Sequence, residues 1–139
     1  MTTRLLFDAS SPLYALKMLR VDALRRNHVQ WLAVYEALNG IWKEVLLHRA
    51  LPAEKAAALV DVLIEVVKHM NVLSPAGLER EIHETALALG TTIYGASCVV
   101  LARKRNSTLV TEDKKLRDKC RGVVEAKSLR ELVAEYGRP

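Results

Sequence analysis

The fold is indicated by residues 94–113, which have the sequence YGASCVVLARKRNSTLVTED. The apolar pattern from Tyr94 to Ala102 predicts a helix, and Ser107–Thr111 predicts a short buried strand followed by acidic residues. A strand with the same ending stands near the N-terminus, where Leu5–Phe7 is followed by Asp8. In an open α/β sheet, ligands bind outside the carboxyl ends of the strands. Both acidic ends are therefore expected at one cleft.

Apolar periodicity and capping residues predict the remaining elements. Ser10-Ser11-Pro12 suits a helix start, Gly90 suits a helix end, Thr91 or Thr92 suits the cap of the next helix, and Ser128 suits the cap of the last one. The other expected helices are Asn27–Arg49, Ala53–Met70, Leu78–Leu89, Asp113–Cys120 and Leu129–Tyr136, and the other expected strands are Asn71–Leu73 and Val123–Glu125. Strands that alternate with helices predict parallel βαβ units and an α/β fold.

Length and composition favour one packed domain over residues 1–139. Half of the residues are hydrophobic, yet no apolar run reaches the ~20 residues that cross a bilayer. The N-terminus enters a strand without a signal-peptide pattern, so a cytoplasmic location is expected. Cys98 and Cys120 are too few and too scattered for a metal motif or a disulfide framework. Cys98 is expected in the core, and Cys120 is expected to be partly exposed.

The formal net charge of +5 permits an anionic partner without proving one. Basic residues gather on both sides of Asp113: Arg103, Lys104, Arg105, Lys114, Lys115, Arg117, Lys119 and Arg121. A second group follows Asp8: Lys17, Arg20, Arg25 and Arg26. Such runs are often only solvated faces of a protein. Their nearness in sequence to the predicted acidic cleft is what favours nucleic-acid binding.

Four short motifs together resemble a PIN domain: Phe7-Asp8-Ala9-Ser10, then Tyr35-Glu36 followed by Asn39, then the Tyr94–Ala102 helix, then Thr111-Glu112-Asp113. The resemblance extends from Leu5 to about Tyr136 and is strongest to VapC-type toxin ribonucleases of prokaryotic toxin–antitoxin pairs, particularly archaeal ones. It implies a three-layer α/β/α sandwich with a central parallel sheet of four to five strands. It also implies a homodimer, an antitoxin partner, RNA as substrate, and Mg²⁺ or Mn²⁺ as cofactor.

Three carboxylates are the candidate metal ligands and catalytic residues, and each has an alternative role. Asp8 and Asp113 suit metal binding at strand ends, but either can simply cap the following helix. Glu36 interrupts an apolar helix face, which is costly for a carboxylate unless it binds metal or forms a solvent-facing salt bridge. Ser10 can support Asp8 with its hydroxyl, and Asn39, three residues after Glu36 on the same side of the helix, can orient Glu36 or a metal-bound water. The resemblance makes Thr111 a supporting hydroxyl, and Glu112 is expected to face solvent. RNA-binding candidates are Arg103, Lys104, Lys114 and Lys115.

Gly95 departs from the family pattern, which has an Asp after the tyrosine in a Tyr-Asp-Ala-Ser arrangement. The chain therefore keeps three of the four expected carboxylates. Glu84 or Asp118 is an open alternative as the substitute acid. The leading hypothesis is a metal-dependent toxin endoribonuclease. The rival is a degenerate PIN fold that binds RNA or a protein without cleavage, and a weaker third is a DNA-processing or ribosome-maturation nuclease.

Overall fold

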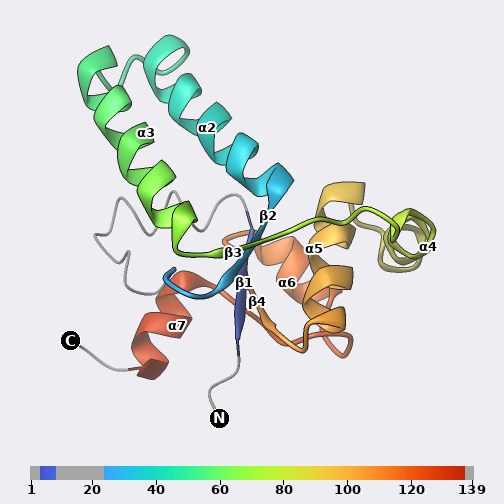
Figure 1. Ribbon diagram of the computed structural model, residues 1–139. Coiled ribbons are helices and arrows are strands. Elements are labelled where there is room, and N and C mark those ends of the chain that lie inside the picture. The colour runs from blue at the N-terminus through green and yellow to red at the C-terminus, as the bar shows by residue number, and fades with distance from the viewer. Residues whose placement is uncertain (1–3, 9–23, 137–139) are drawn as a thin grey trace.

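The computed structural model describes residues 4–8 and 24–136 (Figure 1). The helix start expected at Ser10-Ser11-Pro12, and with it the supporting role expected of Ser10, lies outside the described residues. The basic residues Lys17 and Arg20 lie outside them as well.

The centre of the fold is a five-stranded sheet in the order β3-β2-β1-β4-β5. Its strands are β1 (Leu5–Phe7), β2 (His28–Gln30), β3 (Asn71–Leu73), β4 (Thr108–Val110) and β5 (Ala126–Lys127). Every pair of neighbouring strands is parallel. The apolar first strand occupies the middle position, as expected for a strand that is buried on both faces. The predicted α/β fold with a parallel sheet of four to five strands is confirmed.

Helices cover both faces of this sheet. They are α2 (Trp31–Leu46), α3 (Ala53–Lys68), α4 (Glu79–Leu89), α5 (Ile93–Lys104), α6 (Lys114–Lys119) and α7 (Leu129–Tyr136). Side chains of a strand alternate between the faces, so Phe7 packs with Leu129 of α7 on one side. Leu6 packs on the other side with Val99 of α5 and Leu116 of α6. Figure 1 shows the resulting three layers, with α7 across the sheet from α5 and α6.

A helical hairpin extends from the sheet. Figure 1 shows α2 and α3 running side by side away from the strands. Ala37 and Ile41 of α2 pack on Ala56 and Leu63 of α3 to form a separate apolar cluster. The hairpin therefore has a small core of its own, while its outer surfaces remain uncovered by the described part of the chain.

Two predicted elements were wrong in their bounds. The helix expected over Asn27–Arg49 begins only at Trp31, because His28–Gln30 pairs with both β1 and β3 as a strand. The strand expected at Val123–Glu125 is instead Ala126–Lys127. Val123 and Val124 donate their backbone N–H groups to the Cys120 carbonyl, at 3.0 and 3.2 Å, and so form a turn before the strand.

Three predicted capping residues are confirmed. The Thr92 hydroxyl accepts from the Gly95 N–H at 3.1 Å at the start of α5, and Gly90 ends α4 in the left-handed conformation. Ser128 accepts from the Glu131 N–H at 3.1 Å while Glu131 accepts from the Ser128 N–H at 3.3 Å. This reciprocal pair is a capping box. Cys120 is fully buried rather than partly exposed, because it packs beneath α6 against Leu109 and Val99.

Within residues 4–8 and 24–136, no single helix has both the length and the apolar character required to cross a membrane. The bent pair formed by α4 and α5, with 112° between its helices, meets that requirement by length and composition only.

The centre of the sheet sets the stability of the fold. Phe7 is fully buried between the strands and α7, so Phe7→Ala should lower the free energy of unfolding by about 3–5 kcal/mol. Leu87→Ala, at a side chain that is 72% exposed on α4, is the control and should change it by no more than ~0.5 kcal/mol. Denaturant unfolding of the two variants measures both values. Equal losses would contradict the placement of the core.

Candidate active site

Acidic side chains from separate parts of the chain line one small cleft of about 240 Å³ at the carboxyl ends of the central strands. Its lining residues come from β2, α2, α5, α6 and the segments that follow β1 and β4: Asp8, Gln30, Ala33, Glu36, Thr92, Tyr94, Gly95, Cys98, Asp113 and Leu116. All three candidate carboxylates are therefore at the same cleft. This is the edge at which open α/β sheets bind ligands.

Strand register fixes the floor of the cleft. Phe7 pairs with Val29 of β2 and with Val110 of β4. The residues that come next on the three strands, namely Asp8, Gln30 and Thr111, are therefore neighbours at one level. The Asp8 N–H continues the ladder by donating to the Val110 carbonyl at 3.1 Å.

Thr111 connects two of the carboxylate positions. Its fully buried hydroxyl donates to Oδ2 of Asp8 and accepts from the backbone N–H of Asp113 at 3.1 Å. The Arg117 guanidinium donates to the Thr111 carbonyl at 2.7 Å, which holds the same residue from α6. Thr111 thus has the contacts expected of a supporting hydroxyl.

Asp113 has the capping role considered for it and also lies at the cleft. Its Oδ1 accepts from the Leu116 N–H at 3.2 Å and caps α6. The same side chain lines the cleft. Capping uses one carboxylate oxygen, Oδ1, so it is compatible with a second role for the other oxygen. Glu112, which was expected to face solvent, instead accepts from the Leu129 N–H at 2.8 Å at the start of α7.

The pKa of Glu36 is affected by its position at the cleft. Partial burial and then the negative charge of Asp8 raise the pKa of the Glu36 carboxyl above its ordinary value. Asp8 and Glu36 therefore repel each other across the cleft, as like charges brought close together do. Asn39, one turn further along α2, is exposed and is absent from the lining of the cleft.

Gln30 and Cys98 form a neutral wall beside these acids. The Gln30 amide nitrogen donates to Oγ of Ser97 at 2.9 Å and to Sγ of Cys98 at 3.0 Å. Burial, followed by the nearby charges of Asp8 and Glu36, raises the pKa of the Cys98 thiol to about 12. The thiol stays protonated at neutral pH and supplies no thiolate for a soft metal ion.

Gly95 stands in the first turn of α5 and lines the cleft. A Cβ atom built there would lie 3.2 Å from Cδ1 of Leu116 and 3.5 Å from Oγ1 of Thr92. The nearer contact is the end of a flexible side chain, so a small movement of Leu116 admits a larger residue. Gly95 therefore contributes no ligand and leaves space next to the acids.

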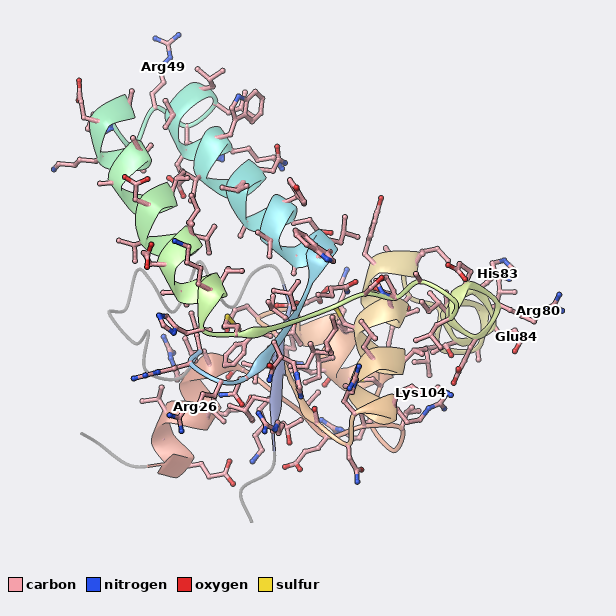
Figure 2. The ribbon with its side chains drawn as sticks, viewed as in Figure 1. Arg26, Arg49, Arg80, His83, Glu84 and Lys104 are labelled. Atoms are coloured by element: carbon pink, nitrogen blue, oxygen red, sulfur yellow. The ribbon has the colours of Figure 1, made fainter. Side chains whose placement is uncertain are left out.

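Neither alternative acid reaches this cleft. Glu84 projects from the outer side of α4, away from the sheet (Figure 2), and lines a different groove with Arg80. Asp118 forms ion pairs with Lys114 at 3.1 Å and with Arg121 at 3.4 Å. It lines a larger, mixed-charge groove of about 680 Å³ between α6 and β5. That groove contains none of the three candidate carboxylates.

The basic candidates fall into two places. Lys114 and Lys115 directly follow Asp113 at the start of α6 and are exposed beside the cleft. Arg103 and Lys104 both pair with Glu81, Lys104 at 3.2 Å. Figure 2 shows Lys104 at the far end of α5. Arg103 lies eight residues beyond Gly95, about 12 Å along the helix at 1.5 Å per residue, so this pair is not at the cleft.

Sequence reasoning missed six residues that line the cleft, the apolar Ala33 and Leu116 and four that carry a polar group or a thiol: Gln30, Thr92, Tyr94 and Cys98. Thr92 was identified only as a cap and Cys98 only as a core thiol. Gln30 was placed inside a helix, where its position at a strand end was hidden. Gln30 is a polar residue at the carboxyl end of a third strand, next to β1. That position would have identified it as part of the cleft.

The donor set of the cleft fits a hard divalent cation. Carboxylate oxygens are the ligands that Mg²⁺ and Mn²⁺ favour, and the repulsion between Asp8 and Glu36 is of the kind that a cation relieves. In the described part of the chain, no three His, Cys, Asp or Glu side chains are arranged to hold an ion together. A cation that binds all three carboxylates directly would require them to move closer together.

Comparison with known proteins was made by sequence and by structure. No family model matches the chain. Two curated proteins of Pyrobaculum aerophilum are similar in sequence. "Ribonuclease VapC3" is 33% identical over 99 residues, which cover 71% of this chain and 75% of that protein. "Exonuclease VapC9" is 34% identical over 98 residues, which cover 70% of each chain.

Solved structures show the same fold. The crystal structure of PAE2754 from Pyrobaculum aerophilum matches with a TM-score of 0.76 and 29% identity, over 96% of this chain and 88% of that one. A chain of VapBC2 from Rickettsia felis, bound to a promoter DNA fragment, matches with a TM-score of 0.61 and 13% identity, over 89% of this chain and 97% of that one. Together with the sequence similarity, these matches define a VapC-type PIN domain. The chain belongs to the VapC family.

The raised pKa of Glu36 leads to a prediction about stability. A carboxylate whose pKa is raised in the fold destabilises that fold when it is ionised, and the effect vanishes below its ordinary pKa of 4.5. Without metal at pH 7, Glu36→Gln should therefore raise the melting temperature by about 1–3 °C. Below pH 4.5 the gain should disappear.

Thermal denaturation in EDTA across this pH range measures the effect. Glu84→Gln, which removes an exposed carboxylate on α4, is the control and should show little change at either end of the range. A gain for Glu36→Gln that stays constant with pH would show that charge is not its cause.

Proposed function

We propose that this protein is the toxin of a toxin–antitoxin pair and that it cleaves RNA at the carboxylate cleft with the aid of Mg²⁺ or Mn²⁺. The observation that carries the proposal is the meeting of Asp8, Glu36 and Asp113 in one cleft at the carboxyl edge of the sheet. Membership of the VapC family and the name of the relative VapC3 support ribonuclease activity. The proposed site of action is the cytoplasm.

Each residue of the cleft has a proposed task. Asp8, Glu36 and Asp113 would hold the divalent cation through their carboxylate oxygens. When bound, such a cation neutralises phosphodiester charge and supports an in-line attack by water. Thr111 keeps Asp8 oriented through their hydrogen bond. Lys114 and Lys115 directly follow Asp113 and would attract the RNA backbone.

RNA can be cut inside the strand or from its ends. The two curated relatives are named a ribonuclease and an exonuclease. We favour an endoribonuclease, as the resemblance to VapC-type toxins implies, and we place the cut at the cleft that four separate stretches of the chain line. Cutting inside a closed circular RNA would distinguish this mode from the removal of terminal nucleotides.

A degenerate protein that binds without cleaving is the second candidate. Two observations favour it: Gly95 supplies no carboxylate, and in the described residues no group of three side chains is ready to hold an ion. On this alternative the fold and the basic residues would still bind RNA or a protein partner. Metal-dependent cleavage by the pure protein separates the two candidates.

Two protein partners are part of the proposal. An antitoxin is supported by the family and by similar structures of complexes, including FitAcB from Neisseria gonorrhoeae. A homodimer is supported by the uncovered hairpin. Large hydrophobic side chains exposed on α2 and α3 are Trp31, Tyr35, Trp42, Leu46, Val62 and Ile64. Homodimer interfaces are typically large and apolar.

The Gly95 position offers the sharpest test of a weakened metal site. Gly95→Asp should tighten Mn²⁺ binding roughly tenfold or more, because it adds a carboxylate beside the ion. It should also raise RNA cleavage. Asp8→Asn should abolish both. Calorimetric titration with Mn²⁺ and cleavage of a labelled RNA measure the two properties.

Gly95→Ala is the matched control, since it adds the same Cβ beside Leu116 without a carboxylate. It should leave Mn²⁺ affinity and cleavage unchanged. Full cleavage by the wild type, with no effect of Gly95→Asp, would refute a crippled site. Absence of Mn²⁺ binding and cleavage in every variant would favour the non-cleaving alternative.

The homodimer is tested by mass in solution. Light scattering at micromolar concentration should give about twice the 15.5 kDa mass of the chain. Leu46→Glu should shift the protein toward monomer, because it places a charge on the exposed face of α2. Leu87→Glu makes the same change on α4 and should leave the dimer intact. A monomeric wild type would rule this interface out.

A further inference from the structure

Gln30 has features that neither packing nor the three carboxylates explain. It ends β2, it is only 2% exposed, and it lines the cleft with Asp8 and Glu36. The parallel register places it beside Asp8 on the neighbouring strand. At the same level of adjacent parallel strands, side chains point to the same face of the sheet. Gln30 and Asp8 are therefore directed to the same side.

Hydrogen bonds determine which way the Gln30 amide faces. The Ser97 hydroxyl donates its single proton to the Tyr94 carbonyl at 2.6 Å. Ser97 can then only accept from Gln30, so the Gln30 amide nitrogen must face Ser97. Both hydrogens of that nitrogen are used, one toward Ser97 and one toward Cys98.

The Gln30 amide oxygen is left without a partner among the described residues. A buried polar atom without a hydrogen bond costs free energy, and such atoms in native proteins call for an explanation. An anchoring role for Gln30 between β2 and α5 uses only its nitrogen. That role leaves the oxygen, at the wall of an acidic cleft, unexplained.

We infer that Gln30 is a positioning residue whose amide oxygen accepts a hydrogen bond from a water molecule carried by the divalent cation of the cleft. The inference rests on the proposed function, since it requires that cation. Magnesium keeps several of its waters when proteins bind it through few carboxylates. An acceptor recessed in the wall, as the Gln30 oxygen is, suits one of those waters better than the cation itself.

A neutral acceptor also suits the charge of this cleft. Asp8 and Glu36 already repel each other, and a fourth carboxylate would add to that repulsion in the free protein. An amide oxygen holds a cation-bound water without adding negative charge. Gln30 thereby compensates in part for the acid that is absent at Gly95.

The test is calorimetric titration of Mn²⁺ alone into the full chain. Gln30→Met keeps the size and loses the oxygen, and it should weaken Mn²⁺ binding about tenfold or more. Gln30→Glu keeps an oxygen acceptor and should bind Mn²⁺ at least as tightly as the wild type. Ser97→Ala keeps the Gln30 oxygen but removes the hydroxyl that orients the amide, so it should weaken Mn²⁺ binding by less than Gln30→Met does.

Wild-type affinity in Gln30→Met, or weaker binding in Gln30→Glu, would overturn the inference and leave a purely anchoring residue. If the wild type binds Mn²⁺ and Asp8→Asn does not, the metal site itself is supported. Either of those two outcomes then refutes only the role of Gln30. If the wild type binds no Mn²⁺, the metal-dependent function fails together with the inference. Melting of each variant in EDTA confirms that it is folded, and Gln30→Glu provides a second test should Gln30→Met not fold.

Discussion

The structure depends on the register of β1 between β2 and β4. Because successive side chains of a strand point to opposite faces, a slip of one residue would move Asp8 to the wrong side of the sheet. Leu6 and Phe7 prevent that slip, since they are buried on opposite faces in two different clusters. Apolar packing of three residues thus determines where the first carboxylate lies. The neighbouring strand ends then bring Gln30 and Thr111 to the same level.

The chain has a positive net charge, but the residues that line the cleft are acidic or neutral. Arg103 and Lys104 are held by Glu81 at the distant end of α5. The cleft itself has an excess of carboxylates with a protonated thiol and an amide beside them. The exposed basic residues Lys114 and Lys115 directly follow one of these acids, Asp113, at the start of α6. An acidic residue of the cleft and exposed basic residues of α6 are therefore neighbours in the sequence.

Much of this arrangement could be predicted from the sequence, and the failures have physical causes. Asp8 and Asp113 were identifiable because apolar strands end shortly before them, β1 at the preceding residue and β4 three residues earlier. The Thr92 and Ser128 caps follow local rules. β2 was not identifiable. It has three residues, it runs without a turn into α2, and its pairing with β1 and β3 depends on residues far away in sequence. Gln30 was missed with it, since its role is visible only once that pairing is known.

The two outer strands of the sheet are very short. β5 has two residues and β3 has three, and each is followed closely by a turn or a helix. Cross-β stacking needs segments of about six or seven residues with free backbone groups. These edges are too brief to template it, as short edge strands commonly are in natural sheets. The described edges of the sheet therefore offer too little backbone for another strand to add to them.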